Sequence, residues 1–517
     1  MQASASGSSW AIATPSDDAT AAGAAAFERG GNAVDAALAA ATAIAVTAPA
    51  SCGVGGDLFA AVQRPDGEML CVNSSGRAPR AVDADAVGRA HDVMPVRGPI
   101  PITVPGAVAG WRAVYDLGAI LPWDSAFTRA IELASDGMRV SRGVVETLEE
   151  PDAAFADDPG LAQIFFEGGA PVAPDAIVRQ PALAATLAAI AADGPDALYR
   201  GDVGRAYVRG LRDAGSPISA EDLAAHRALV VPPLGAAYRG LHVSVVPPNS
   251  QGFVLLEILS LVERLGIDPD PLGPDAGTLA RVFAAAAADR DRHLADPDRM
   301  TVHPSTLLDD GHLAGLADEF RVAHVVRSGR PDGDTIALVT ADAEGFGVSL
   351  IQSLFWGFGA GILEPATGIV AHNRGACFAL EPGHPNAFAP GVRPAHTLMP
   401  VIVHDDRGMA AVAGTMGGYA QPQINAQTLS HLFAGSSPAE AVAAPRWIVE
   451  RDAEVPSVTI ESGVPAGARA SIEASGFASM PVPDLTSDLG HAQVIRVRPG
   501  GFDAGSDPRS DGGAAAG

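Results

Sequence analysis

The chain is short of cysteine and of basic residues for its length of 517. Its three cysteines, Cys52, Cys71 and Cys377, are odd in number and far apart, so they offer neither a disulfide framework nor a metal-binding motif. Lysine and arginine total 34 against 60 aspartate and glutamate residues, a formal net charge of −26. Because no basic patch is available to neutralise phosphates, this composition excludes nucleic acid as a partner.

The sequence also lacks a segment typical of membrane targeting. Residues 1–4 have neither the basic start nor the apolar core of a signal peptide. The longest apolar stretch, 33–50, is rich in alanine and contains Asp35, so it predicts a buried helix and no membrane partner. Together with the unpaired cysteines, these features favour a cytoplasmic location.

What the sequence does contain is a helical first part. Asn32 can cap a helix after the stop at Gly30-Gly31, and the small residues of 51–56 allow backbone to approach backbone. The predicted helices are 18–29, 35–46, 183–192, 253–265 and 279–292, and a hairpin pairs 58–63 with 68–73.

The second part predicts strands paired around turns. The predicted pairs are 336–341 with 347–353, 401–404 with 409–412, and 492–497 with a strand at Phe502, with a helix over 423–433. Residues 326–334 read as a linker, and the Gly/Ala-rich tail after Arg509 is predicted to be mobile. Helices followed by hairpins indicate layered sheets covered by helices, an α+β arrangement.

Thr335 stands where the polar linker meets the first of these strands. If the bond before it is cut, the new chain starts with a threonine whose amine can act as general base for its own hydroxyl. One residue would then supply both nucleophile and base. The alternative is an ordinary threonine at the start of a strand.

Short glycine-rich motifs follow one another along nearly the whole chain. They are GGNAVDAA (30–37), CGVGG (52–56), VPGAVAGW (104–111), LYRG (198–201), PPNSQG (247–252), ADR (288–290), DP (296–297), DT (334–335), GFGAG (357–361), GTMGG (414–418) and SDPR (506–509). Each motif alone is unspecific, but the ordered set resembles the gamma-glutamyltransferase (gamma-glutamyltranspeptidase) family.

This resemblance implies an N-terminal nucleophile (Ntn) hydrolase fold, a four-layer αββα sandwich of the α+β class. It implies self-cleavage between Asp334 and Thr335, giving a large subunit (1–334) and a small subunit (335–517) that together form one fold. Thr335 would attack an amide carbonyl and pass the acyl group to water or to an amine. No metal or organic cofactor is implied, and assembly of the heterodimer into a homo-oligomer stays open.

The resemblance also assigns three further positions to catalysis. Ser353 falls where the family has a hydroxyl that bonds to the nucleophile, a spacing that suits a strand, a tight turn and a returning strand. Gly417 and Gly418 match glycines whose N–H groups stabilise an oxyanion. The alternatives are an ordinary strand serine and a loop that needs positive φ.

The sequence departs from the family where the substrate's amino group is bound. Phe355, Arg374 and Cys377 stand at the positions of an asparagine, an acidic or amide residue and an aspartate in glutamyl transferases. None can accept from an ammonium group as a carboxylate does, and Arg374 would repel it. The pocket therefore does not suit a γ-glutamyl group.

The positions that bind the substrate's α-carboxylate differ as well. His396 and Thr397 replace paired serines, and Ser75 stands where an arginine is usual, with Arg77 two residues on. An anionic acyl group clamped by Arg77 or Arg374 through paired N–H donors fits this set. A salt bridge is the alternative role for either arginine, and satisfying buried backbone is the alternative for His396.

The segments SGRAP (75–79), QSL (352–354) and MGG (416–418) resemble the oxamate amidohydrolase branch of the family, which implies a small oxo-acid amide as substrate and ammonia as product. Tyr419 could close such a pocket or merely pack. Two other readings stay open: glutamyl transfer or hydrolysis with the amino group recognised elsewhere, and a family member without catalysis.

Overall fold

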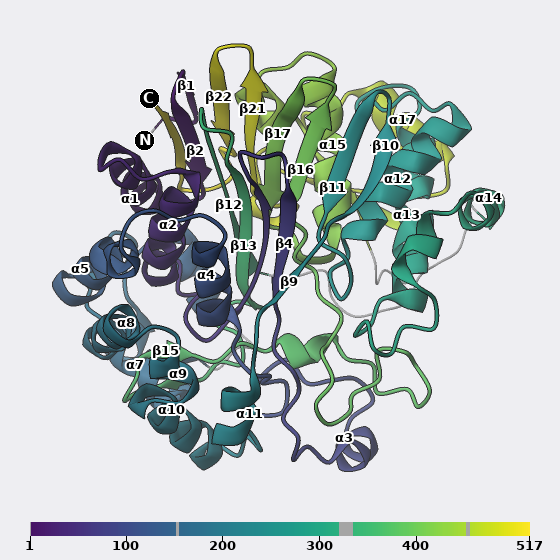
Figure 1. The fold of residues 1–517 in the computed structure, drawn as a ribbon. Helices are drawn as coiled ribbons and strands as arrows, with labels where there is room; N and C mark the ends of the chain where they lie inside the picture. The colour runs from purple at the N-terminus through teal and green to yellow at the C-terminus, as the bar shows by residue number, and fades with distance from the viewer. Residues whose placement is uncertain (1, 151–154, 320–333, 451–454) are drawn as a thin grey trace.

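Two β-sheets stacked face to face form the centre of the molecule, and helices cover both outer faces (Figure 1). The structure is a computed structural model that describes residues 2–150, 155–319, 334–450 and 455–517. The layer order is αββα, and the fold class is α+β as predicted.

The first sheet carries the strand that contains Thr335. Every pair of adjacent strands in this sheet runs antiparallel. In spatial order the strands are β23 (Gly513–Ala516), β2 (Trp10–Thr14), β12 (Asp334–Asp342), β13 (Gly347–Phe355), β3 (Asp57–Gln63), β4 (Met69–Ser74) and β9 (Leu229–Val231).

The second sheet is also antiparallel throughout. Its order is β1 (Ser4–Gly7), β22 (Gly501–Ser506), β21 (Ala492–Arg498), β17 (Gly408–Thr415), β16 (Val401–Asp405), β11 (Leu241–Val245) and β10 (Leu234–Tyr238). Smaller strands lie outside the two sheets: β5 (Met138–Arg139), β6 (Phe166–Glu167), β7 (Ala170–Pro171), β8 (Ile177–Val178), β14 (Leu363–Glu364), β15 (Ile369–Val370), β18 (Trp447–Val449), β19 (Ser457–Glu461) and β20 (Ala478–Val482).

The helices divide between the two outer faces, apart from the short α3 (Ala84–Ala90) (Figure 1). On the side of the first sheet lie α1 (Asp17–Glu28), α2 (Ala33–Thr47), α4 (Ala107–Asp116), α5 (Thr128–Asp136), α6 (Arg142–Leu148), α7 (Pro159–Phe165), α8 (Pro181–Asp193), α9 (Asp196–Tyr199), α10 (Asp202–Asp213) and α11 (Ala220–Ala225). On the side of the second sheet lie α12 (Gly252–Leu265), α13 (Ala276–His293), α14 (Asp310–Glu319), α15 (Gln421–Phe433), α16 (Pro438–Ala443) and α17 (Ala466–Ala474).

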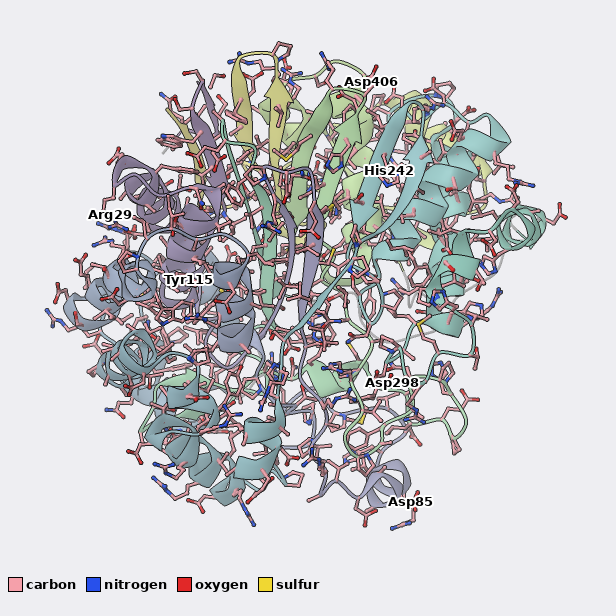
Figure 2. The ribbon with its side chains drawn as sticks, viewed as in Figure 1. Arg29, Asp85, Tyr115, His242, Asp298 and Asp406 are labelled. Carbon is pink, nitrogen blue, oxygen red and sulfur yellow. The ribbon has the colours of Figure 1, made fainter. Side chains whose placement is uncertain are left out.

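The alternation of side chains along β12 explains the layering. Ile336 and Leu338 join the core under the helices, whereas Ala337 and Val339 join the cores between the sheets. Successive side chains of a strand point to opposite faces, so an apolar strand with both faces buried must lie in an inner layer. Charged residues such as Arg29, Asp85 and Asp406 lie exposed at the surface (Figure 2).

The predicted elements occur with small shifts at their ends. Asn32 caps α2 by accepting from the backbone N–H groups of Val34 and Asp35, and Asp35 completes a capping box. The apolar stretch predicted as a buried helix is α2, which is buried along its whole length. Among the described residues, no helix is long and apolar enough to cross a bilayer.

The tail prediction is wrong. Gly513–Ala516 form β23, which pairs with β2 at the edge of the first sheet. The backbone oxygen of Gly517 accepts from Ser9 at 2.7 Å. Backbone hydrogen bonds to a neighbouring strand order these small residues, and composition does not reveal them. The predicted linker lies outside the described residues except for Asp334, which begins β12.

The small-residue loop before β3 allows a close backbone contact, as predicted. A Cβ on Gly55 would lie 2.0 Å from the carbonyl oxygen of Val370, and one on Gly56 would lie 2.5 Å from that of Ser353. Both contacts are with backbone, which cannot rotate away. The loop therefore holds β13 and the segment around β15 against the start of β3.

We expect Gly55→Ala to destabilise the protein by about 1–3 kcal/mol or more, because the added methyl group overlaps backbone. Gly88→Ala is the matched control, since a Cβ there meets nothing within 4 Å. Urea unfolding of the two variants checks this. Equal midpoints for the two variants would contradict the packing argument.

Candidate active site

Thr335 lies at the start of β12 with its hydroxyl against the neighbouring strand. Its side chain is almost fully buried. The pairing with β13 shifts register between Asp334 and Ile336, which leaves Thr335 at an irregular point of the ladder. Its Oγ1 donates to Oγ of Ser353 at 2.9 Å. The predicted turn between the strands therefore brings the two hydroxyls together, and their roles in catalysis stay predictions.

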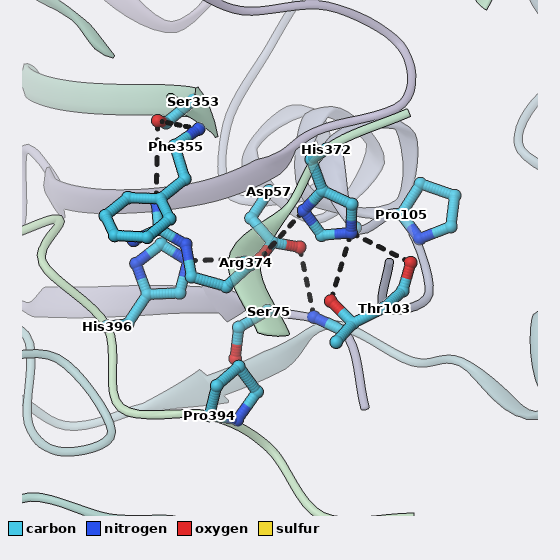
Figure 3. Close-up of polar contacts among 12 residues, drawn as sticks. Asp57, Ser75, Thr103, Pro105, Ser353, Phe355, His372, Arg374, Pro394 and His396 are labelled. Atoms are coloured by element: carbon cyan, nitrogen blue, oxygen red, sulfur yellow. Dashed lines mark hydrogen bonds and ion pairs between the residues drawn. The ribbon is translucent and has the colours of Figure 1, made fainter. Parts of the chain in front are cut away.

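Ser353 is held from two further sides (Figure 3). Its Oγ accepts from the backbone N–H of Phe355 at 2.8 Å and from a guanidinium N–H of Arg374 at 3.4 Å. Donors on the serine oxygen fix its lone pairs and so fix where it can meet Thr335. Arg374 reaches it from the short 3-10 helix η4 (Arg374–Cys377).

Arg374 is a buried cation without a carboxylate partner. It is 0% exposed, and no carboxylate among the described residues lies within ion-pair distance of it. One N–H donates to Oγ1 of Thr397 at 3.0 Å, and the guanidinium lies 4.1 Å from the ring centroid of Phe355. Its Nε has no hydrogen-bond partner among the described residues. A buried charge is costly unless it is paired, so this arginine is suited to bind an anion.

Gly417 and Gly418 form the turn after β17. Their φ angles are +135° and +52°, and a Cβ on Gly417 would lie 2.4 Å from Cδ1 of Ile424. The positive φ angles favour glycine at both positions, and the clash adds to this at Gly417. The side chain of Gln251 donates to the carbonyl oxygens of Gly418 and Thr397, at 2.9 and 2.8 Å. Because Thr397 accepts from Arg374, contacts run without a break from Thr335 to the glycine turn.

A second arginine supports this turn. Arg290, on α13, donates to Oε1 of Gln251 and to the carbonyl oxygen of Tyr419, both at 3.2 Å. Its guanidinium also lies 4.7 Å from the ring centroid of Tyr419. The Tyr419 hydroxyl donates to Sγ of Cys377 at 3.4 Å, and its ring meets Phe355 edge-on. Tyr419 therefore packs among the site residues.

The two ring nitrogens of His396 contact Asp57 and the backbone of Leu398. Its Nε2 lies 3.1 Å from Oδ2 of Asp57, and its Nδ1 accepts from the backbone N–H of Leu398 at 3.4 Å. The Nε2 proton therefore goes to Asp57. Asp57 also accepts from Gly76 N at 3.0 Å and lies 3.5 Å from Nδ1 of His372. These contacts do not test the predicted substrate role of His396, which stays a prediction.

Burial and charge set the protonation of this group. Burial, with the nearby Arg374, lowers the pKa of His396 to about 3, so its ring is neutral. Burial alone would raise the pKa of Asp57, but His372, His396 and Arg374 lower it to about 2. Asp57 is therefore a carboxylate that lies opposite Ser353 in the β3–β13 ladder.

Arg77 lies apart from these contacts. Its guanidinium is 2.9 Å from Oδ2 of Asp296 and donates to the carbonyl oxygen of Gly391 at 2.8 Å, and the side chain is 39% exposed. No contact among the described residues joins it to Thr335. The salt bridge named as the alternative is present, and a substrate role for Arg77 stays a prediction.

Three residues of the network were not singled out from the sequence. Gln251 and Arg290 each lie in one of the ordered motifs, and Asp57 directly follows another. Their place in these motifs could have pointed to them from the sequence. Their contacts could not be predicted, because Gln251, for example, contacts residues 146 and 167 positions away in the chain.

Comparison with known proteins gives one consistent family. The family model described as "Gamma-glutamyltranspeptidase" matches residues 19–517. The chain is 35% identical to the oxamate amidohydrolase proenzyme of Klebsiella pneumoniae over 506 residues, covering 95% of each chain. It is 33% identical to the glutathione hydrolase-like YwrD proenzyme of Bacillus subtilis, covering 99% of each.

Among solved structures, a cephalosporin acylase from Bacillus halodurans superposes with a TM-score of 0.90 at 31% identity, covering 100% of this chain and 97% of that one. The similarity extends over both sheets and their helices. The fold is thus shared along the full length of the chain.

The buried neutral histidines predict a loss of stability in mild acid. The pKa of His396 is about 3 in the folded protein and about 6.5 when unfolded, so between these values the unfolded chain binds the extra proton. Stability should therefore fall as pH drops from 6.5. Removing one such histidine should make the slope shallower by about 1.4 kcal/mol per pH unit.

Urea unfolding of wild-type protein and of His396→Gln at pH 7, 6 and 5 measures this slope. Equal slopes for the two proteins would show that His396 is protonated in the folded state or is exposed to solvent.

Proposed function

The chain belongs to the gamma-glutamyltranspeptidase family, and from this premise we propose that it is a self-processing threonine amidohydrolase. Its substrate is a small amide that carries a carboxylate, and its nucleophile is Thr335. The observation that carries the substrate class is the buried, unpaired guanidinium of Arg374, which contacts the serine bonded to the nucleophile.

Processing cuts the bond between Asp334 and Thr335. The Thr335 hydroxyl attacks the carbonyl carbon of Asp334, the C–N bond breaks, and water hydrolyses the resulting ester. The products are a large subunit, 1–334, and a small subunit, 335–517, that remain together. Two relatives named as proenzymes support this step. So does the core shared by the two parts, since β12 lies between β2 of one part and β13 of the other.

The freed α-amine of Thr335 is the general base. The sequence contains no lysine, and arginine does not lose its proton in proteins. Both ring nitrogens of His396 are already engaged. An amine on the nucleophile itself needs no further basic side chain, which fits a site whose charged neighbour is an arginine.

In the catalytic reaction the amine takes the proton of the Thr335 hydroxyl as Oγ1 attacks the substrate amide. The backbone N–H groups of Gly417 and Gly418 stabilise the oxyanion. The C–N bond then breaks, ammonia leaves with the transferred proton, and water releases the acid from the ester. Ser353 holds Thr335 Oγ1 in line during both steps.

The substrate's carboxylate binds Arg374. This guanidinium has a free Nε and lies above Phe355, a surface with no acceptor for an ammonium group. The α-ammonium group of a γ-glutamyl substrate would be repelled by this cation. The 35% identity to an oxamate amidohydrolase supports a small oxo-acid amide.

Thr335→Ala should leave a single chain of full length without amidase activity, because both nucleophile and base are lost. Thr335→Ser should keep processing, since a serine supplies the same two groups. Denaturing mass spectrometry locates the new terminus. The exposed Thr301→Ala is the matched control. A full-length wild-type chain with amidase activity would overturn the proposal.

Arg374→Lys should raise KM for oxamate by about 10–100-fold, because a point charge on a flexible stem cannot replace two buried N–H donors. Arg77→Ala should change KM by less than about threefold, since its charge faces Asp296. Ammonia release from oxamate, compared with chromophore release from a γ-glutamyl anilide, gives both constants. A larger effect of Arg77→Ala, or faster turnover of the anilide, would reject Arg374 as the anchor.

A further inference from the structure

Three helices on the outer side of the second sheet bring metal-ligating side chains together away from Thr335. Glu257 lies on α12, Asp289 on α13 and His312 on α14. One ligand atom from each lies within 4.8 Å of the other two. These helices lie beside one another on the right of Figure 1. None of the three residues contacts Thr335 or Ser353 in the described structure.

Within the described residues, the carboxyl group of Glu257 is buried without a hydrogen-bond partner. The residue is 0% exposed, and neither carboxyl oxygen has a hydrogen-bond donor among the described residues. A buried carboxyl group without donors is costly, so such a group needs a bound proton or a cation. Burial and the neighbouring Asp289 raise the pKa of Glu257 well above its ordinary range.

His312 stands between the two carboxyl groups. Its Nε2 lies 2.9 Å from Oδ2 of Asp289 and 3.8 Å from Oε1 of Glu257. Ligand atoms around a tetrahedral zinc ion with bonds of ~2.0–2.1 Å are about 3.3 Å apart. The two observed distances lie on either side of that value, so small side-chain rotations would place all three atoms around one ion.

Two further groups face this cluster. Nε2 of His293 lies 3.6 Å from Oδ1 of Asp289, and Nδ1 of the same ring is buried without a partner among the described residues. The side chain of Arg292 lies 3.6 Å from the same carboxylate oxygen and is 45% exposed. His293 therefore lies beside the cluster without belonging to it, while Arg292 partly neutralises Asp289 from the solvent side.

We propose that Glu257, Asp289 and His312 form a binding site for one divalent transition-metal ion of the zinc type, distinct from the proposed active site. Two carboxylates and an imidazole suit this class, whereas calcium and magnesium prefer ligand sets made of oxygen alone. In the metal-bound site, the two carboxylates balance the double positive charge of the ion. The charge of the ion thereby offsets the free-energy cost of burying the carboxyl group of Glu257 without a hydrogen-bond donor.

Binding also has a defined proton balance. The carboxyl group of Glu257 releases its proton, and the His312 ring places its remaining proton on Nδ1 so that Nε2 binds the ion. Affinity therefore increases with pH.

The ion would fasten α14 to α12 and α13. This matters for the site because α14 is the last described helix before β12, and Asp289 precedes Arg290, which supports the glycine turn. The role is structural, since no ligand of the ion touches the nucleophile.

The test uses the full chain, freed of metal with a chelator and then dialysed against zinc chloride. We expect about one zinc per chain by mass spectrometry of the desalted protein, and a zinc-dependent rise in Tm. Cobalt(II) in place of zinc should give visible absorption bands of a low-symmetry site. The cobalt spectrum of the wild-type protein tests the site even if a variant does not fold.

Glu257→Gln and His312→Gln should each lose zinc retention and the zinc-dependent rise in Tm. Glutamine has the shape of a protonated glutamate, so the first variant should still fold. His242→Gln, at an exposed histidine on β11 (Figure 2), is the matched control and should retain both. Failure of the wild-type protein to retain zinc would overturn the proposal. Zinc retention by both site variants at the wild-type level would also overturn it. A higher Tm of Glu257→Gln without any zinc uptake by the wild type would overturn it too, because it would indicate a proton shared with Asp289.

Discussion

The antiparallel pairing of β12 with β13 is the constraint on which the site depends. It lies at the centre of the first sheet, with apolar cores on both faces, so neither strand can slide without moving a whole set of buried side chains. This fixed register leaves Thr335 at the irregular end of the ladder, with its hydroxyl bonded to that of Ser353. The start of a strand in a fixed register therefore positions the Thr335 side chain more precisely than a flexible loop would.

Charge is distributed around this pair in an unusual way. Arg374 is buried without a carboxylate partner on one side of Ser353, whereas Asp57 is a buried carboxylate that receives neutral His396 on the other. The charge beside Ser353 is thus positive where Arg374 lies. Under the proposed function, an anionic substrate would balance this charge. A γ-glutamyl substrate brings an ammonium group as well, for which the described site has Phe355 in place of an acceptor.

Much of the architecture was predictable because local rules and tertiary packing agree. Asn32 caps α2 as its position after Gly30-Gly31 indicates, and the hairpins form around their turn residues. The prediction of a mobile tail was wrong because Gly and Ala residues are ordered where they can pair with the edge of a sheet. Here the tail pairs with β2. The motif singled out Arg77, but the sequence could not show that Asp296 lies 2.9 Å from its guanidinium.

The sequence by itself determined the elements, the order of the motifs and the candidate nucleophile, because periodicity, capping and turn chemistry act between residues close in the chain. Only the tertiary structure decided which side chains meet. The contacts of Arg374 with Thr397, of Gln251 with Gly418 and of His312 with Asp289 join separate segments of the chain. Burial then sets their charge states, since the cost of a charge depends on everything packed around it and not on its neighbours in the chain.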